Sequence, residues 1–108
     1  MVELTFETPL DAIFGSLADP TRRDMLRRLM GGGMSIGELA APYDMSFAAV
    51  SKHLTVLEEA GLIFKRKEGR KRIVCLAPQA LAEADAYLRQ YRQLWESRFD
   101  SLEQYLAR

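Results

Sequence analysis

Two helix-start signals placed close together constrain the fold of this 108-residue chain most strongly. Ser35 and Glu38 have the spacing of a capping box, in which each side chain bonds a backbone N–H at a helix start, and Pro42 stops that helix early. After a turn of about four residues, Ser46 is positioned to cap a second and longer helix. This order predicts a helix-turn-helix over residues 35–60.

The longer helix of the pair has two faces of different chemistry. Val50, Leu54 and Leu57 share one face, so we expect them to pack inward. The opposite face is small, polar or basic, and the acids Glu58 and Glu59 come only at its far end. Such a face fits a DNA major groove, which is about 12 Å wide. The candidate DNA-binding residues here are Ser46, Phe47, Ala48, Ser51, Lys52 and Thr55. His53 lies at the flank of the apolar face, where packing or a phosphate contact is favoured over base reading.

Charge is concentrated in one segment of a chain whose 15 basic and 15 acidic residues balance overall. Residues 46–74 carry seven basic and three acidic side chains, a local charge of +4. Most of these bases fall in a predicted β-hairpin over residues 62–76 that turns near Gly69. Such a run is often plain solvated surface, but directly after a helix-turn-helix it favours a phosphate or minor-groove contact. The candidate DNA-binding residues of the hairpin are Lys67, Arg70, Lys71 and Arg72.

The last part of the chain is a continuous amphipathic pattern. From Pro78 onward apolar side chains recur at steps of three and four residues, which predicts one helix over residues 78–107, about 43 Å long. A compact chain of this size has a radius of gyration of only about 13 Å, so the outer turns need a covering surface. The same helix and the first helix of a second copy supply one with two-fold symmetry, and we expect a homodimer. The candidate interface residues are Leu10, Phe14, Leu88, Tyr91, Trp95, Phe99 and Leu102.

Several other classes of protein are disfavoured by the residues present. Cys75 and His53 are the only cysteine and histidine, too few for a site of three or four metal ligands, so no metal or cofactor is expected. Ser51 and His53 point to different sides of one helix and cannot act as nucleophile and base. The glycines of residues 31–33 follow a helix and not a strand, so they do not form a phosphate loop. An enzyme is therefore not expected, and a redox role for Cys75 stays open and disfavoured.

No targeting or membrane signal is expected either. Residues 1–19 have four acids and no base, the opposite of a secretion signal. No apolar run approaches the roughly 20 residues that span a bilayer. We therefore expect a bacterial cytoplasmic protein without a membrane partner.

Five linked segments together resemble the ArsR family of bacterial winged-helix repressors. They are residues 17–23 (LADPTRR), 36–40 (IGELA), 49–54 (AVSKHL), 57–63 (LEEAGLI) and 67–70 (KEGR). The resemblance implies a homodimer that binds a pseudo-palindromic operator near a promoter and blocks transcription. It also implies that Phe47, Ala48, Ser51, Lys52 and His53 match the DNA-reading helix and that residues 67–72 match the wing.

One departure from the family is informative. Founding members sense metals through a Cys-x-Cys on the first helix of the pair, or through histidine and acidic residues on the last helix. Here the matching thiol positions hold Ser35 and Gly37, and the last helix has no histidine. The chain therefore resembles the metal-independent branch, and a small-molecule inducer is not identified.

The sequence thus predicts a mainly α fold with a small β-hairpin, a winged helix-turn-helix with a long C-terminal dimerisation helix. One DNA-binding domain is expected over residues 1–108, with its core at 10–76 and the dimerisation helix at 78–107. The predicted function is a sequence-specific DNA-binding transcriptional regulator, acting as a repressor on double-stranded DNA. The alternative is a winged-helix protein–protein adaptor that does not bind DNA, against which the basic hairpin argues.

Overall fold

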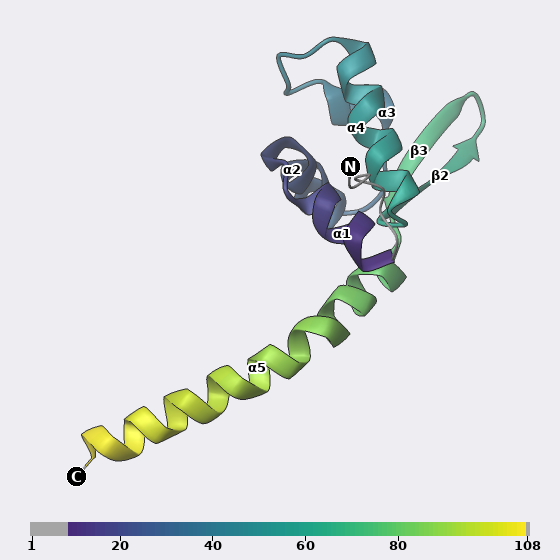
Figure 1. Ribbon diagram of the computed structural model, residues 1–108. Coiled ribbons are helices and arrows are strands. Elements are labelled where there is room, and N and C mark those ends of the chain that lie inside the picture. Colours follow the sequence, from purple (N-terminus) through teal and green to yellow (C-terminus); the bar gives the residue numbers. More distant parts are fainter. Residues whose placement is uncertain (1–8, 108) are drawn as a thin grey trace, which may run out of the picture.

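The computed structural model describes residues 9–107, so residues 1–8 and 108 of the predicted domain lie outside it. Five helices and three short strands follow one another in this part of the chain (Figure 1). In order they are α1 (Pro9–Leu17), α2 (Pro20–Leu29), β1 (Met34–Ser35), α3 (Ile36–Ala40), α4 (Phe47–Glu59), β2 (Ile63–Glu68), β3 (Lys71–Leu76) and α5 (Pro78–Leu106). The predicted fold class is confirmed, with α3 and α4 as the helix pair and β2–β3 as the hairpin that follows.

The helix starts are those that the sequence predicts. Ser35 accepts a hydrogen bond from the backbone N–H of Glu38 at 3.2 Å, and the Glu38 carboxylate accepts one from the Ser35 backbone at 3.4 Å, which confirms the capping box. Ser46 accepts a bond from the N–H of Ala49 at 3.1 Å. Asp19 caps α2 in the same way. Each such cap stabilises its helix by about 1 kcal/mol.

The sheet has one strand more than the predicted hairpin. β1 pairs antiparallel with β3, placing Met34 opposite Val74, and the strand order is β1-β3-β2. Gly33 permits this close approach, because a Cβ there would lie 2.7 Å from Ile73 Cγ2 and 3.0 Å from Cys75 Sγ. The hairpin itself begins at Ile63 and not at Leu62 as expected. A third strand of only two residues shows no alternation that sequence reasoning could detect.

The hydrophobic core lies between α1, α2, α4 and the sheet. The expected inward face of α4 is confirmed, since Val50, Leu54 and Leu57 are fully buried. Met25 of α2 and Val74 of β3 are buried with them in one cluster. Burying a side chain of this size stabilises a fold by about 1.5–3 kcal/mol, so α4 is held firmly by its inner face.

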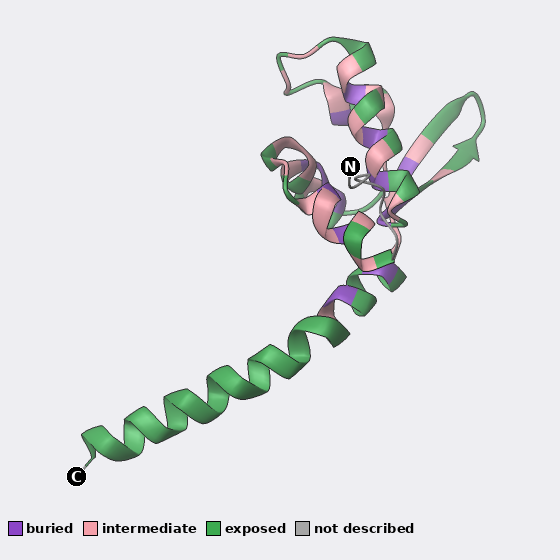
Figure 2. Ribbon diagram, in the orientation of Figure 1, coloured by how far each residue is buried: buried purple, intermediate pink, exposed green. Residues whose placement is uncertain are grey.

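Helix α5 leaves the body after its first turns. Ala80 and Ala84 are buried, and Phe14 of α1 meets Tyr87 edge to face at 5.7 Å between ring centroids. Beyond that point the helix projects away and is exposed on all sides (Figure 2). The radius of gyration is accordingly 18.2 Å, against the roughly 13 Å of a compact chain. No helix among residues 9–107 is both long and apolar enough to cross a bilayer.

Candidate nucleic-acid interface

The outward face of α4 presents the small and polar side chains that the sequence indicates. Ser46, Ala48, Lys52 and Thr55 are exposed, and Ser51 is half-buried. The Phe47 ring at the start of the helix is 68% exposed, although it is large and apolar. The Thr55 hydroxyl donates to the Ser51 carbonyl at 3.0 Å. Six of the candidate residues on this helix are therefore accessible to a ligand, and whether they contact DNA stays a prediction.

His53 has a different environment from the other candidate DNA-binding residues of α4. Its side chain is only 19% exposed, and its Nδ1 lies 3.3 Å from Arg22 Nη1 and 3.9 Å from Asp19 Oδ2. Both partners belong to the start of α2, on the inner flank of α4. These contacts favour the packing role over base reading for His53.

Arg22 is a positioning residue that sequence reasoning did not single out. Its Nε donates to the Ser16 carbonyl at 2.7 Å and its Nη2 to the Gly15 carbonyl at 3.2 Å. The buried Ser16 hydroxyl in turn donates to the Val56 carbonyl of α4 at 3.5 Å and to the Ala12 carbonyl at 2.7 Å. The network joins α1, α2 and α4, so it fixes the position of α4 relative to the other two helices and its rotation about its own axis. In the sequence, the LADPTRR segment (residues 17–23) indicates the helix cap at Asp19, but it does not indicate the contacts of Arg22 with α1 and α4.

The Asp19 carboxylate adds a charge to this network. The backbone N–H of Arg22 bonds it at 3.0 Å and lowers the pKa of Asp19 below its ordinary value. Burial opposes this effect in part, and the nearby His53 and Arg22 side chains each lower the pKa of Asp19 by a smaller amount. Asp19 therefore stays ionised to a lower pH in the folded protein than in the unfolded chain.

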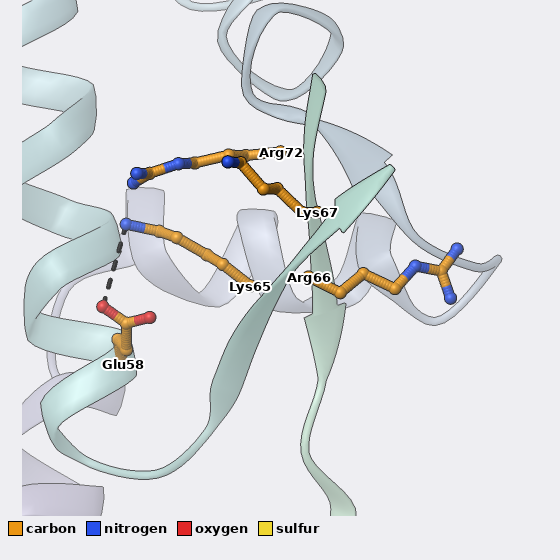
Figure 3. Close-up of a pocket in the computed structure, with 5 residues that line it drawn as sticks. All are labelled: Glu58, Lys65, Arg66, Lys67 and Arg72. Atoms are coloured by element: carbon orange, nitrogen blue, oxygen red, sulfur yellow. Dashed lines mark ion pairs between the residues drawn. The ribbon is translucent and has the colours of Figure 1, made fainter. Parts of the chain in front are cut away.

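The hairpin β2–β3, residues 63–76, is called the wing below. Lys67, Arg70, Lys71 and Arg72, its four predicted DNA-binding residues, are all exposed, and Gly69 makes the turn with φ at +64°. A further cation, Lys65, is absent from the predicted set. Its Nζ lies 3.7 Å from the Glu58 carboxylate at the end of α4 (Figure 3). Lys65 thus lies beside the same helix that presents the acid-free face.

An apolar stripe on α5 is the second accessible feature of interest. Trp95 stacks on Phe99 at 5.5 Å between ring centroids, yet the two side chains remain 61% and 58% exposed. Of the remaining predicted interface residues, Leu88, Tyr91 and Leu102 are also exposed, whereas Leu10 and Phe14 of α1 are half-buried. All seven predicted residues thus have surface that a second molecule can reach.

Comparison with known proteins identifies the family. A family model described as a helix-turn-helix domain matches residues 17–64. The chain is 42% identical over 78 residues to the HTH-type transcriptional regulator Rv2034 of Mycobacterium tuberculosis, covering 72% of each. It is 34% identical over 61 residues to the transcriptional repressor SdpR of Bacillus subtilis, covering 56% of this chain and 68% of SdpR. A crystal structure of an ArsR-family transcriptional regulator matches 82% of this chain and 98% of its own, with a TM-score of 0.76 and 39% identity. The chain belongs to the ArsR family.

As an ArsR-family protein, the chain is a DNA-binding transcriptional regulator and not an enzyme, and both predictions are confirmed. The matched helix-turn-helix segment runs from the last residue of α1 through α4 to the start of β2. The alternative of an adaptor that does not bind DNA finds no support among these relatives.

Ser35 and Gly37, which match the metal-binding cysteines of founding ArsR-family members, have structural roles in this chain. Ser35 serves the capping box of α3, and Gly37 lies in the first turn of the same helix. Across residues 9–107, no three His, Cys, Asp or Glu side chains are grouped so that they could hold a metal ion. Cys75, in β3, is half-buried.

Proposed function

We propose that this ArsR-family regulator is a homodimeric repressor of an operator with two-fold symmetry. Two copies pair through α1 and α5, and their α4 helices enter successive major grooves on one side of the duplex. The observation that carries the proposal is the exposed apolar stripe of α5, with the Trp95 and Phe99 rings more than half accessible. Exposed aromatic stripes of this kind mark interfaces between proteins.

Two-fold pairing also matches the spacing of successive major grooves on duplex DNA. A dimer of helix-turn-helix proteins reads half-sites about 34 Å apart, one turn of the duplex. Within each half-site, Ser51 and Lys52 face base edges, and the free N–H groups at the start of α4 suit a phosphate. Arg70 and its neighbours on the wing bind the backbone, where contacts add affinity without sequence preference.

Repression follows from occupancy of the operator near a promoter. A relative with 34% identity is named a transcriptional repressor, which supports this direction of control. A DNA ligand also implies action in the bacterial cytoplasm.

Selection of bound fragments from random duplex DNA tests the proposal. We expect two inverted half-sites with centres about 10–10.5 base pairs apart. A duplex with about five extra base pairs between the half-sites is the control, because it turns them to opposite faces and abolishes tight binding. A single asymmetric motif, or a selected site that fails to lower transcription from an adjoining reporter promoter, contradicts the proposal.

A further inference from the structure

The wing carries its cations on two different faces, because side chains alternate along a strand. Lys67 pairs with Arg72 across the hairpin, and Lys65 pairs with Val74, which is fully buried against the core. Lys65, Lys67 and Arg72 therefore share the side of the sheet that faces α4. Arg66 extends from the other face, away from α4 (Figure 3).

A cleft of about 440 Å³ lies between this face and the end of α4. Its lining residues are Glu58, Lys65, Lys67, Arg72 and Arg66, but the Arg66 guanidinium extends away from α4, so only the other four direct a charged group into the cleft (Figure 3). All of them are charged, whereas a site for a small organic ligand is lined mainly by apolar side chains. The chemistry of the lining indicates an anion that carries its charge on oxygen atoms, such as a phosphate.

The charges in the cleft are not balanced. Lys65 is paired with Glu58, at 3.7 Å. In the described part of the chain, no ion pair joins Lys67 or Arg72 to an acid, whereas Arg66 is paired with Glu68 at 3.2 Å on the other face. Two cations in the cleft therefore lack a counter-charge.

We propose that the cleft binds a backbone phosphate of duplex DNA, held by Lys65, Lys67 and Arg72. The inference rests on the proposed placement of α4 in the major groove. The sugar-phosphate strand that borders this groove separates it from the next minor groove, so a helix in one groove and a wing beside the other must straddle that strand. The cleft lies between α4 and the wing, where the strand passes.

Glu58 limits the strength of this contact. Its carboxylate holds Lys65 in the cleft but also repels an incoming phosphate, because the two anions compete for the same ammonium group. Glu58 therefore lowers the affinity for every duplex equally, since the contact involves no base. This reduces binding to non-operator DNA, for which phosphate contacts supply almost all the affinity.

The salt dependence of duplex binding tests the cleft. Each neutralised phosphate contributes about 0.9 to the slope of log affinity against log salt, so loss of one contact in each half of a dimer lowers the slope by about 2. We expect this loss in Lys67→Ala and in Arg72→Ala. Arg66→Ala is the matched control, because it removes the same charge from the adjacent position on the opposite face, and its slope stays near that of the wild type. All three side chains are exposed, and equal melting temperatures confirm that the variants are folded.

Three outcomes separate the possibilities. If Arg66→Ala lowers the slope as much as Lys67→Ala, the cleft proposal is overturned while the DNA-binding function stands. If the wild-type protein binds duplex DNA with no salt dependence, the proposed function fails and the cleft fails with it. Replacing chloride by inorganic phosphate at equal ionic strength distinguishes the source of the phosphate. Phosphate that weakens duplex binding by the wild type but not by Lys67→Ala supports the shared cleft, whereas phosphate that binds through Lys67 without weakening duplex binding shows a site for the free ion and overturns the assignment to the DNA strand.

Glu58→Gln provides the opposite change at the same site. It removes the repulsion and releases Lys65, so we expect affinity for operator and random duplexes to rise by a similar factor, with a steeper salt slope. Glu59→Gln is the control, because it makes the same charge change at a residue that does not line the cleft. Unchanged or weaker binding by Glu58→Gln, or an equal gain in Glu59→Gln, contradicts the role of Glu58.

Discussion

Arg22 Nη1 lies 3.3 Å from His53 Nδ1, so the start of α2 contacts α4 on the inner flank of the helix proposed to read DNA. The two residues are 31 positions apart in the chain. The same guanidinium bonds two carbonyls at the end of α1, so one side chain connects three helices. The position of α4 relative to the wing depends on this junction.

Arg22→Ala should destabilise the fold. The variant leaves the Ser16 carbonyl without the Arg22 donor, whereas the Gly15 carbonyl keeps the N–H of Ala18 at 3.3 Å, and an unsatisfied buried group costs about 1–3 kcal/mol. Arg22→Lys should rescue little, because one ammonium group cannot reproduce the planar fork of donors. Arg23→Ala is the control, since Arg23 is exposed and its loss should cost under about 0.5 kcal/mol. Urea unfolding measures all three, and full rescue by lysine would contradict the assigned role.

His53→Ala should alter stability and leave base preference unchanged. The side chain packs against Arg22 and Asp19, so the truncation removes contacts inside the protein. The measurement is a comparison of binding to the selected operator and to single-base variants of it, alongside thermal unfolding. A changed order of preference among those duplexes would show that His53 reads a base.

Asp19 should contribute stability that depends on pH. Its folded pKa is lowered, so the carboxylate stabilises the folded state above its unfolded pKa of about 3.9. That contribution is lost as the pH falls through the lower folded pKa. Asp19→Asn keeps a capping oxygen but no charge, and its free energy of unfolding should fall less steeply below about pH 4 than that of the wild type.

Asp19→Ala separates the cap from the charge. It should cost about 1 kcal/mol more than Asp19→Asn at neutral pH, because Asp19→Asn loses the charge but keeps a capping oxygen. Denaturant unfolding at pH 7 and at pH 3 measures both variants. Parallel pH profiles for wild type and Asp19→Asn would show that the charge contributes nothing.

Lys52→Ala and Arg70→Ala should weaken DNA binding in different ways. Lys52 is exposed on α4, where a side chain meets base edges, so its loss should change preference among operators by about 1–3 kcal/mol at one position. Arg70 lies at the turn of the wing, where its loss should weaken all duplexes alike. Binding to a panel of single-base variants distinguishes the two, and identical profiles would refute this division.

Trp95→Asp should produce monomers. The substitution places a charge in the middle of the proposed interface, where it has no partner. Gln93→Asp is the matched control, because two residues along a helix correspond to about 200° of rotation and point the new charge away from the stripe. Size-exclusion chromatography at several concentrations checks both variants. A dimer that survives Trp95→Asp places the interface elsewhere.

The helices were predictable because their signals are local. Ser35, Ser46 and Asp19 each bond a backbone group three residues away, so the sequence alone contains both partners. The inward face of α4 follows from the helical period in the same way. The strand β1 was not predictable, because its two residues are specified by the partner strand β3 and by the space left at Gly33.

The arrangement of the candidate site was only partly predictable. The sequence identified a basic hairpin but could not sort its cations, because the facing of Lys65 and Arg66 depends on the register with β3. It placed His53 at the flank of the apolar face but could not choose between packing and a phosphate contact. The contact with Arg22 that turns His53 inward depends on how α2 crosses α4, and no local pattern encodes that crossing.

The bare outer turns of α5 have a thermodynamic consequence. A lone chain can close its core around α4, yet the last turns of its longest helix rest on nothing within the described chain (Figure 2). A helical segment without packing is only marginally stable in water. Completion of this helix is therefore coupled to association, and the heat resistance of the protein should rise with its concentration.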